Sequence, residues 1–386
     1  MESVAASQGG LAESRLIRRT DLVPCSLAFI DCKMPGSLLK QNYSIIGAGV
    51  TQSSEQVVNL DEPHGFALGV AAMPHGVTNN LHVHYTAEVF MVFKGEWLFR
   101  WGEDGRDGEF VGRAGDVVSI PTWIFRGFTN IGADDSWIFT ALGRDESGGV
   151  IWDPKILAGA AEHGLYLTRE NMMVDTATGA AKPSDAELMP PLTPEVIAGF
   201  RRYAPDEMAA RVTTAAERAW SDRSLLCGVL PGMRAELAPV IGPGMTQDRD
   251  ARPKVTNPHG FSIEWLRIEP GNTVGPFRID PKQVLILQTG RLKIELEADG
   301  ERSSVEAGPW DTFATPAGVW RSFTALGDEP AVMTVTTAGD ARAHPEWTPE
   351  IRRAAWEAGY GLDPNGYLAP AAFLPSFSAP DALRAA

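Results

Sequence analysis

Residues 76–95 read Gly76-Val-Thr-Asn-Asn-Leu-His82-Val-His84-Tyr-Thr-Ala-Glu88-Val-Phe-Met-Val-Phe-Lys-Gly95, with two histidines two residues apart and a glutamate four residues after the second. On a β-strand, residues two apart point to the same face, so both imidazoles would project side by side. A short turn after His84 can bring Glu88 next to them. Two histidines and one carboxylate at one point make a three-ligand metal site, and open positions in such a site suit non-haem Fe(II) and related ions.

The composition is that of an acidic globular protein. A chain of 386 residues exceeds what one hydrophobic core usually serves, so two domains are expected. The contents of 44% hydrophobic and 22% charged residues are ordinary for a globular chain. The formal net charge of −15 repels phosphate backbones, which argues against nucleic acid as a partner.

Cysteine usage and hydropathy indicate a reducing, membrane-free setting. Cys25, Cys32 and Cys227 are too widely spaced for a disulfide framework or a cysteine zinc site. Residues 1–19 lack the apolar run of a signal peptide, and no later stretch approaches a membrane span. We therefore expect a cytoplasmic protein with no membrane partner.

The chain contains an internal repeat with a constant offset of 195 residues. The matching segments are Ile46–Gln52 with Ile241–Gln247, Pro63–Phe66 with Pro258–Phe261, Arg126 with Arg321, and Trp152 with Trp347. Because no net gap interrupts these matches, the sequence predicts a tandem duplication of a domain-sized unit.

Each unit is predicted to be built from β-strands and closed by a helix. The strands expected in the first unit are 66–73, 81–84, 89–93, 97–101, 117–120, 124–129 and 136–141. Many short strands between turn signals predict a sandwich or barrel. Helices are expected at 155–162, after the cap pair Asp153-Pro154, and from Thr348-Pro349 to about residue 358. The predicted domains are residues 1–166 and 224–386, joined by a helical bridge at 167–223.

Two motifs in the first unit resemble those of the cupin superfamily. The first is Gly76-x5-His82-x-His84-x3-Glu88-x6-Gly95, and the second is Gly115-x5-Pro121-x4-Arg126-x3-Asn130. With its duplication, the chain resembles a bicupin. The resemblance implies an all-β fold of two tandem jelly-roll β-barrels joined by a helical linker, with a short helix closing each barrel.

The resemblance also implies a ligand set. The usual ligands in the superfamily are the two histidines and the glutamate of the first motif and a histidine of the second. These positions hold His82, His84, Glu88 and Arg126 here. Arginine stays protonated and cannot donate a lone pair, so a metal in this barrel would have three protein ligands.

The second unit has lost the first motif. The offset places Phe277, Ile279 and Gln283 where the first unit has its histidines and glutamate. No metal is expected there. An arginine, Arg321, nevertheless persists in the second motif, and Asp280 or Asp311 could be its partner.

Arg126 has two interpretations. In the first, it forms a buried ion pair with Glu88 that satisfies both charges without a metal. In the second, its planar donor group binds an anionic or carbonyl oxygen of a substrate at the metal. The persistence of Arg321 opposite Gln283 favours the second interpretation, because an arginine needed only to neutralise a carboxylate would be free to change.

Other candidate residues are aromatic or shared by both units. Trp123, Phe90 and Phe128 are predicted to line a substrate pocket, although ordinary core positions would also explain them. His64 and His259 occupy equivalent places in the two units, which indicates a structural role for both.

Bicupins with one intact and one eroded barrel resemble dioxygenases of the gentisate and quercetin types. This resemblance implies an Fe(II) enzyme that cleaves a small oxygenated aromatic or dicarbonyl substrate, with Mn, Ni, Cu and Zn left open as the metal. One alternative is an O₂-independent metal-dependent isomerase, lyase or decarboxylase. Another is a non-catalytic ligand-binding bicupin held by a Glu88–Arg126 pair. The expected partner is a small anionic or oxygen-rich molecule, and a homo-oligomer is left open.

Overall fold

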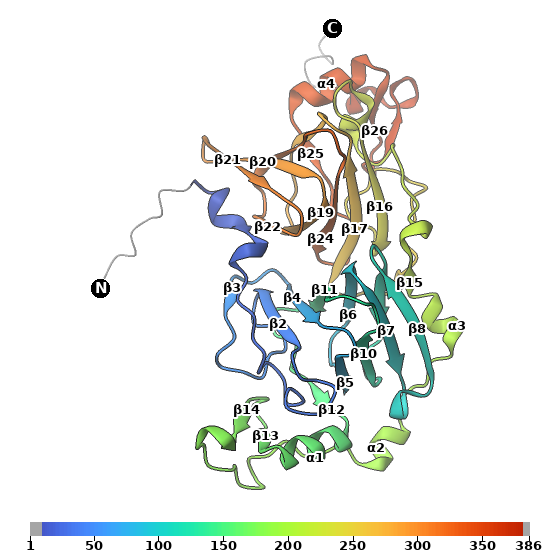
Figure 1. The fold of residues 1–386 in the computed structure, drawn as a ribbon. Helices are drawn as coiled ribbons and strands as arrows, with labels where there is room; N and C mark the ends of the chain where they lie inside the picture. Colours follow the sequence, from blue (N-terminus) through green and yellow to red (C-terminus); the bar gives the residue numbers. More distant parts are fainter. Residues whose placement is uncertain (1–9, 381–386) are drawn as a thin grey trace. The chain divides into compact units, whose positions relative to one another are not determined.

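The computed structural model describes residues 10–380 and divides the chain into two compact units (Figure 1). The first unit is Leu22–Glu217, and the second contains residues 10–21 together with residues 218–380. These units differ from the predicted division in two places. The segment 10–21 lies with the second barrel, and residues 167–217 of the predicted bridge lie with the first. The predicted domain ends at 1–9 and 381–386 are outside the described residues.

The first unit contains two β-sheets of the jelly-roll type. The seven-stranded sheet has the order β15-β9-β6-β11-β4-β2-β3, and the five-stranded sheet has the order β12-β5-β10-β7-β8. Only β2 and β3 pair in parallel among these strands. The strands of the first sheet are β2 (Gln41–Ile46), β3 (Val58–Leu60), β4 (Phe66–Met73), β6 (Glu88–Lys94), β9 (Val117–Ile120), β11 (Ser136–Gly143) and β15 (Val212–Thr213). Those of the second are β5 (Thr78–Val83), β7 (Glu96–Trp101), β8 (Gly108–Arg113), β10 (Arg126–Asn130) and β12 (Ile151–Trp152).

Alternation of side chains builds the core of this unit. On β7, Trp97, Phe99 and Trp101 are buried while the residues between them are partly exposed, as the period of two in a strand requires. On β6, which lies between β9 and β11 in the larger sheet, nearly every residue is buried. Phe90 packs against Phe99 and Phe128, with ring centroids 5.1 and 5.0 Å away.

The remaining elements of the first unit are short. They are α1 (Pro154–Glu162), β13 (Leu165–Leu167), β14 (Met173–Asp175), α2 (Pro194–Ala198), α3 (Pro205–Ala209), and the 3-10 turns η3 (Glu103–Gly105), η4 (Thr176–Thr178) and η5 (Ala215–Glu217). The side chain of Asp153 caps α1 by accepting from the Lys155 amide at 2.8 Å. The predicted bridge contains two five-residue helices, which pack on the barrel through Ile197 of α2 and Met208 of α3.

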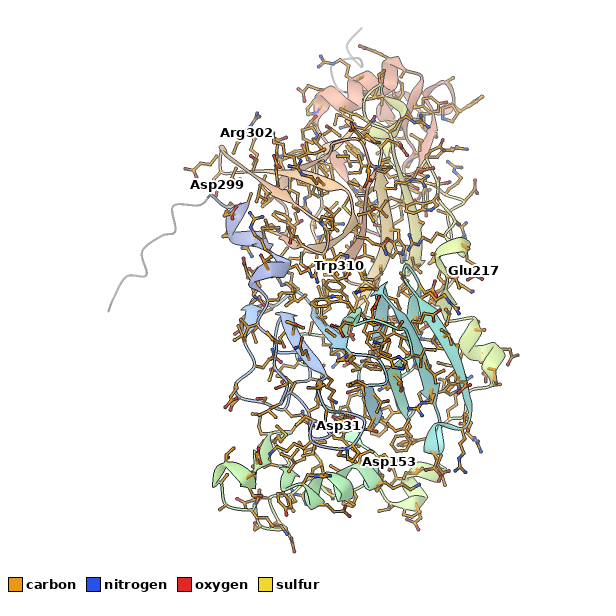
Figure 2. All side chains as sticks on the ribbon, in the orientation of Figure 1. Asp31, Asp153, Glu217, Asp299, Arg302 and Trp310 are labelled. Atoms are coloured by element: carbon orange, nitrogen blue, oxygen red, sulfur yellow. The ribbon has the colours of Figure 1, made fainter. Side chains whose placement is uncertain are left out.

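The second unit repeats this architecture. Its sheets have the orders β1-β22-β19-β24-β17-β16 and β21-β20-β23-β18-β25. The strands are β1 (Leu16–Ile17), β16 (Ala235–Ile241), β17 (Phe261–Ile268), β18 (Thr273–Arg278), β19 (Gln283–Thr289), β20 (Arg291–Ala298), β21 (Glu301–Ala307), β22 (Thr312–Thr315), β23 (Trp320–Leu326), β24 (Ala331–Ala338), β25 (Glu346–Trp347), β26 (Tyr360–Leu362) and β27 (Leu368–Pro370). Asp299 and Arg302 mark the β20–β21 turn in Figure 2.

An N-terminal segment completes the second unit. β1 extends the larger sheet by pairing with β22, and η1 (Glu13–Arg15) lies beside β21 and β22 (Figure 1). Helix α4 (Pro349–Glu357) closes the barrel at the expected place. The other short helical turns are η2 (Arg19–Asp21), η6 (Leu226–Val229), η7 (Ala371–Phe373) and η8 (Ser376–Ser378).

The predicted fold class is confirmed. β4 and β9 have the predicted bounds, and the repeat reappears as matched strands, since β17 and β22 lie 195 residues after β4 and β9. Several strands of the first unit were not predicted, among them β2 and β8, where polar residues and, in β8, glycines give weak strand signals. Among residues 10–380, no helix is long and apolar enough to span a membrane.

Candidate metal centre and cavity

The three candidate metal ligands converge in the first unit. His82 lies near the end of β5, His84 directly follows that strand, and Glu88 begins β6 in the other sheet. The connection over residues 84–87 therefore joins the two sheets at the site. All three side chains are buried, and their ligand atoms lie within 4.8 Å of one another. His84 Nε2 is 3.5 Å from Glu88 Oε1. The predicted cluster is thus present.

Backbone carbonyls orient both imidazoles. His82 Nδ1 lies 2.6 Å from the Asn80 carbonyl oxygen, and His84 Nδ1 lies 3.2 Å from that of Gly149. A carbonyl oxygen can only accept, so we assign the ring proton of each histidine to Nδ1. Each Nε2 then keeps a free lone pair, which is the arrangement found in metal-ligating histidines. The donor set of two such nitrogens and a carboxylate fits a divalent transition metal.

The charges around the ligands suit metal binding. Burial, with help from His84, lowers the pKa of His82 well below its ordinary value of 6.5, so its imidazole is neutral. Burial alone would raise the pKa of Glu88, but His84 and Arg126 outweigh it and hold this pKa at about 2. The cluster therefore offers a neutral imidazole at His82 and a charged carboxylate, the forms that ligate a metal.

Arg126 reaches Glu88 but is only partly engaged. It begins β10, where its Cα pairs with that of His82. Its Nη2 donates to the Pro121 carbonyl at 2.6 Å, whereas its Nε lies 3.7 Å from Glu88 Oε2. Arg126 Nε, Arg126 Nη1 and Glu88 Oε2 have no hydrogen-bond partner. Burial lowers the pKa of Arg126 to about 10, against the opposing effect of Glu88. The contact is an ion pair without a hydrogen bond.

The equivalent Arg321 is fully engaged. Its three nitrogens donate to Gln283 Oε1 at 3.1 Å and to the carbonyls of Pro316 at 2.9 Å and Val319 at 3.0 Å. The sequence-based suggestion of Asp280 or Asp311 as its partner is therefore wrong. In the second barrel, the side-chain amide of Gln283 stands at the position of Glu88 and accepts a hydrogen bond from Arg321. In the first barrel, Nε and Nη1 of Arg126 have no acceptor.

A cavity of about 60 Å³ lies against the ligand cluster inside the first barrel. His82, His84 and Glu88 form part of its wall, together with Lys40 and Asn79. Its apolar wall includes Leu68, Val70, Met73, Phe90, Phe128, Leu142, Val150 and Trp152. The cluster thus faces a cavity with a largely apolar wall, which is typical of small-molecule sites.

The other predicted substrate residues lie in different places. Phe90 and Phe128 line the cavity, whereas Arg126 and Trp123 are not among its wall residues. Trp123 is 42% exposed and packs against Tyr85 and Phe200, with ring centroids 5.5 and 5.8 Å away.

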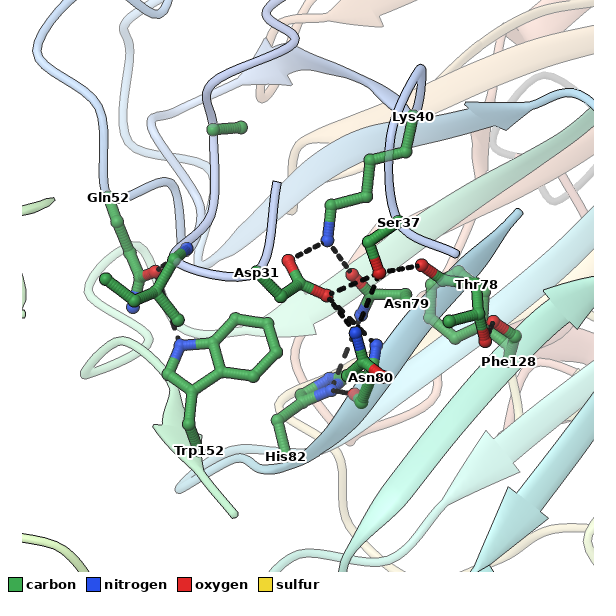
Figure 3. Close-up of polar contacts among 12 residues, drawn as sticks. Asp31, Ser37, Lys40, Gln52, Thr78, Asn79, Asn80, His82, Phe128 and Trp152 are labelled. Carbon is green, nitrogen blue, oxygen red and sulfur yellow. Dashed lines mark hydrogen bonds and ion pairs between the residues drawn. The ribbon is translucent and has the colours of Figure 1, made fainter. Parts of the chain in front are cut away.

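A buried ion pair near His82, between Lys40 and Asp31, was not predicted from the sequence (Figure 3). The Lys40 ammonium contacts Asp31 Oδ1 and donates to Asn79 Oδ1 at 2.8 Å. Asp31 Oδ2 accepts from the Asn80 amide at 3.1 Å and from the Asn80 side chain at 3.0 Å. Because the Asn80 carbonyl receives the Nδ1 proton of His82, Asp31 helps to orient this ligand. One sequence signal could have found the pair: the second unit, which lacks the metal motif, has Ala235 at the position of Lys40.

The second barrel is filled where the first is hollow. At the position of Gly69, a wall residue of the cavity, the second unit has the fully buried Glu264. Its Oε1 accepts from the Met245 amide at 3.0 Å, and burial raises the pKa of Glu264 to about 8. The Met245 sulfur contacts Gln283 Nε2 at 3.5 Å. Phe277 occupies the position of His82 and is buried in the core.

Comparison with known proteins finds solved structures with a similar fold but low sequence identity. No family model matches the sequence, and no curated protein does. Among solved structures, oxalate decarboxylase of Lactobacillus farciminis in a formate complex is 11% identical, with a TM-score of 0.53 and coverage of 91% of this chain and 90% of that one. Vicilin of Corylus avellana is 11% identical, with a TM-score of 0.53 and coverages of 89% and 93%. Vicilin of Capsicum annuum is 12% identical, with a TM-score of 0.54 and coverages of 86% and 88%.

The fold is therefore that of a bicupin. Its first barrel contains a His-His-Glu cluster that can hold a divalent metal. At the corresponding positions the second barrel has Phe277, Ile279 and Gln283, which do not form this ligand set.

Proposed function

We propose that this protein is a metal-dependent enzyme that acts on a small oxygen-bearing molecule in its first barrel. The leading reaction class is dioxygenation by an Fe(II) enzyme. The observation that carries the proposal is the convergence of Glu88 with two imidazoles whose Nδ1 atoms face carbonyls. Such an arrangement presents three donors to one point at the wall of a cavity.

We assign a separate role to each group of residues in the first barrel. His82, His84 and Glu88 would hold the metal, which would polarise a substrate oxygen and, as Fe(II), allow reaction with O₂. His84 and Arg126 would keep the Glu88 carboxylate charged, and the two unfilled donors of Arg126 lie beside that carboxylate rather than in the cavity wall. Phe90 and Phe128 exclude water and pack against the body of the substrate.

The cavity volume favours a small substrate. A dry cavity of about 150 Å³ admits benzene, whereas the space beside the cluster is about 60 Å³. A short dicarbonyl or carboxylate compound fits such a space without rearrangement. An aromatic substrate, the other class that the resemblance implied, requires the cavity wall to move.

Metal reconstitution and oxygen uptake test the proposal. Purified protein is loaded with Fe(II), Mn(II) or Zn(II), its bound metal is measured, and O₂ consumption is followed with short dicarbonyls, hydroxy acids and catechols. We expect one metal per chain and substrate-dependent O₂ uptake with Fe(II). His82→Ala should abolish both, whereas His259→Ala in the second barrel should abolish neither. Absence of O₂ uptake with every compound would contradict the dioxygenase proposal.

An O₂-independent lyase or decarboxylase is the second candidate. Lys40 favours it, because a buried ammonium at the cavity wall could protonate the carbanion left after a C–C bond is cleaved. Turnover without O₂, retained with Mn(II) or Zn(II), would support this class. If bound metal stays well below one per chain after reconstitution, a non-catalytic ligand-binding protein becomes the better description.

A further inference from the structure

Lys40 is a buried cation that the leading dioxygenase proposal does not use. Its side chain is 4% exposed and forms part of the same cavity wall as His82, His84 and Glu88. Figure 3 shows its ammonium pointing toward Asp31 and Asn79. A lysine is almost never fully buried without a partner or a function.

The ammonium has a donor to spare. A lysine offers three N–H donors, and within residues 10–380 two acceptors meet them, Asp31 Oδ1 and Asn79 Oδ1. The rings of Phe29 and Trp152 flank the nitrogen, with centroids 5.1 and 5.7 Å away. These rings attract the cation and confine it, but they do not replace a hydrogen-bond acceptor. The third donor is therefore available to a molecule in the cavity.

Charge balance indicates the sign of that molecule. Asp31 and Lys40 cancel each other, as do Glu88 and Arg126. A divalent metal on the cluster would leave two uncompensated positive charges in a buried site, a costly state unless an anion joins it. The cavity is thus electrostatically suited to a ligand with one or two negative charges.

The second barrel shows that the fold itself does not require the Asp31–Lys40 ion pair. Cys227, Ala235 and Val274 stand at the positions of Asp31, Lys40 and Asn79, since the Leu226 amide donates to Gln247 as the Ile30 amide donates to Gln52. All three are buried in the core of the second barrel. The same fold is therefore built without the ion pair. Replacing a buried ion pair by apolar residues is often neutral or stabilising, so stability alone does not explain its presence beside the cavity.

We propose that Lys40 is a substrate-binding residue whose ammonium donates its third hydrogen bond to an anionic oxygen of the substrate. The inference rests on the proposed function and narrows its substrate class. The substrate is a short-chain acid whose carboxylate or enolate meets Lys40 while a second oxygen function faces the metal ligands. Asp31 and Asn79 position the ammonium for this contact.

Binding of a small acid and its neutral counterpart tests the inference. Dissociation constants of propionate and propionamide are measured by ligand-observed NMR on the metal-free full-length protein. We expect propionate to bind roughly ten-fold more tightly or better, the usual effect of a hydrogen bond to a charged group. Equal binding of the two compounds to the wild type would overturn the inference, whatever the variants do.

A charge-neutral double variant assigns the effect to Lys40. Lys40→Met combined with Asp31→Asn removes both charges, so that neither is left buried alone. The matched control is Lys33→Met with Asp175→Asn, which removes a partly exposed ion pair of the same unit. The preference for propionate should vanish in the first double variant and persist in the second. A preference that survives without Lys40 would overturn the inference.

Metal content and turnover keep the two proposals apart. Protein that binds no metal, or binds it without turnover, but prefers propionate through Lys40 would contradict the proposed function and leave the inference standing. Protein that turns over a substrate with unchanged KM in the Lys40 double variant would contradict the inference and leave the function standing.

Discussion

Glu88 is the residue on which the candidate centre depends. One oxygen of its carboxylate lies 3.5 Å from His84 Nε2, and the other lies 3.7 Å from Arg126 Nε. Both distances are too long for a good hydrogen bond, and Glu88 Oε2 has no hydrogen-bond partner. A buried carboxylate in this state is under-satisfied, and a metal ion would supply the missing interaction.

Glu88→Gln should therefore weaken metal binding without unfolding the barrel. We expect a loss of affinity of more than about 100-fold, because removal of outer-shell partners alone costs 10- to 100-fold. Stability should change by less than about 2 kcal/mol, since Gln283 already accepts from Arg321 in the second barrel. Equilibrium dialysis with elemental analysis and urea unfolding measure the two effects. Gln283→Ala serves as the control, and an unchanged affinity of Glu88→Gln would contradict the assignment of this ligand.

Glu264 should make the second unit less stable as the pH rises. Burial raises its pKa from 4.5 to about 8, so the folded state holds a proton that the unfolded state releases between these values. Stability from this group is thus complete below pH 4.5 and is lost as the pH rises through about 8. The total change is roughly 3–5 kcal/mol.

Comparison of wild type with Glu264→Gln isolates this effect. The amide cannot ionise, so the difference in unfolding free energy between the two proteins should shift in favour of the variant from pH 5 to pH 9. Urea unfolding at several pH values measures it. A difference that stays constant across this range would show that Glu264 does not carry a raised pKa.

At the scale of elements, tight turns set the register between strands. The turn between β6 and β7 contains Gly95, whose φ of +92° is unfavourable for other residues. A Cβ at Gly95 would also lie 1.7 Å from Ser136 Oγ, the hydroxyl that donates to Asn130 Oδ1 at 2.8 Å. The glycine is thus required by both backbone and packing.

Gly95→Ala should destabilise the first unit by about 2–4 kcal/mol. Gly76→Ala is the matched comparison. Gly76 also has positive φ, at +78°, but a Cβ there would have nothing within 4 Å, so we expect about 1 kcal/mol. Urea unfolding of both variants gives the two values. Equal losses would show that the contact with Ser136 does not matter.

The two closing helices should respond differently to loss of their first cap residue. Asp153 accepts from the Lys155 amide, whereas the Thr348 side chain forms no capping hydrogen bond in α4. Asp153→Ala should cost about 1 kcal/mol, and Asp153→Asn much less, because asparagine caps equally well. Thr348→Ala should change thermal stability little. A similar loss in Thr348→Ala would contradict the difference between the caps.

At the scale of the whole molecule, the two barrels of the duplicated chain differ in their interiors. The first barrel keeps a cavity, a metal-type cluster and a buried ion pair. The second has filled the corresponding space with Glu264 and Met245 and has satisfied its arginine internally. A filled barrel leaves little room for a ligand.

Metal binding should therefore protect one unit. We expect one divalent ion per chain, with slower amide hydrogen exchange confined to residues 22–217. At a free metal concentration 100 times Kd, the stabilisation is about 2.7 kcal/mol. Hydrogen-exchange mass spectrometry with and without Mn(II) measures the pattern. Added protection centred on β17 or β19, or two ions per chain, would contradict a single site in the first barrel.

Local patterns in the sequence were enough to predict the architecture and the ligand cluster. The offset of 195 residues revealed the duplication, and the spacing of His82, His84 and Glu88 located the site. Both are local signals, because alternation on a strand and the length of one turn decide where neighbouring side chains point. The loss of these residues in the second unit also placed the predicted site in the first barrel.

Contacts between distant segments were decided only by the tertiary structure. Asp31, Lys40 and Asn79 meet because closure of the barrel brings residues before β2 against β5. No local pattern encodes the volume of the cavity, the partial engagement of Arg126, or the pairing of β1 with the second barrel. Each depends on how close-packed side chains from separate strands share one interior, a property of the folded chain as a whole.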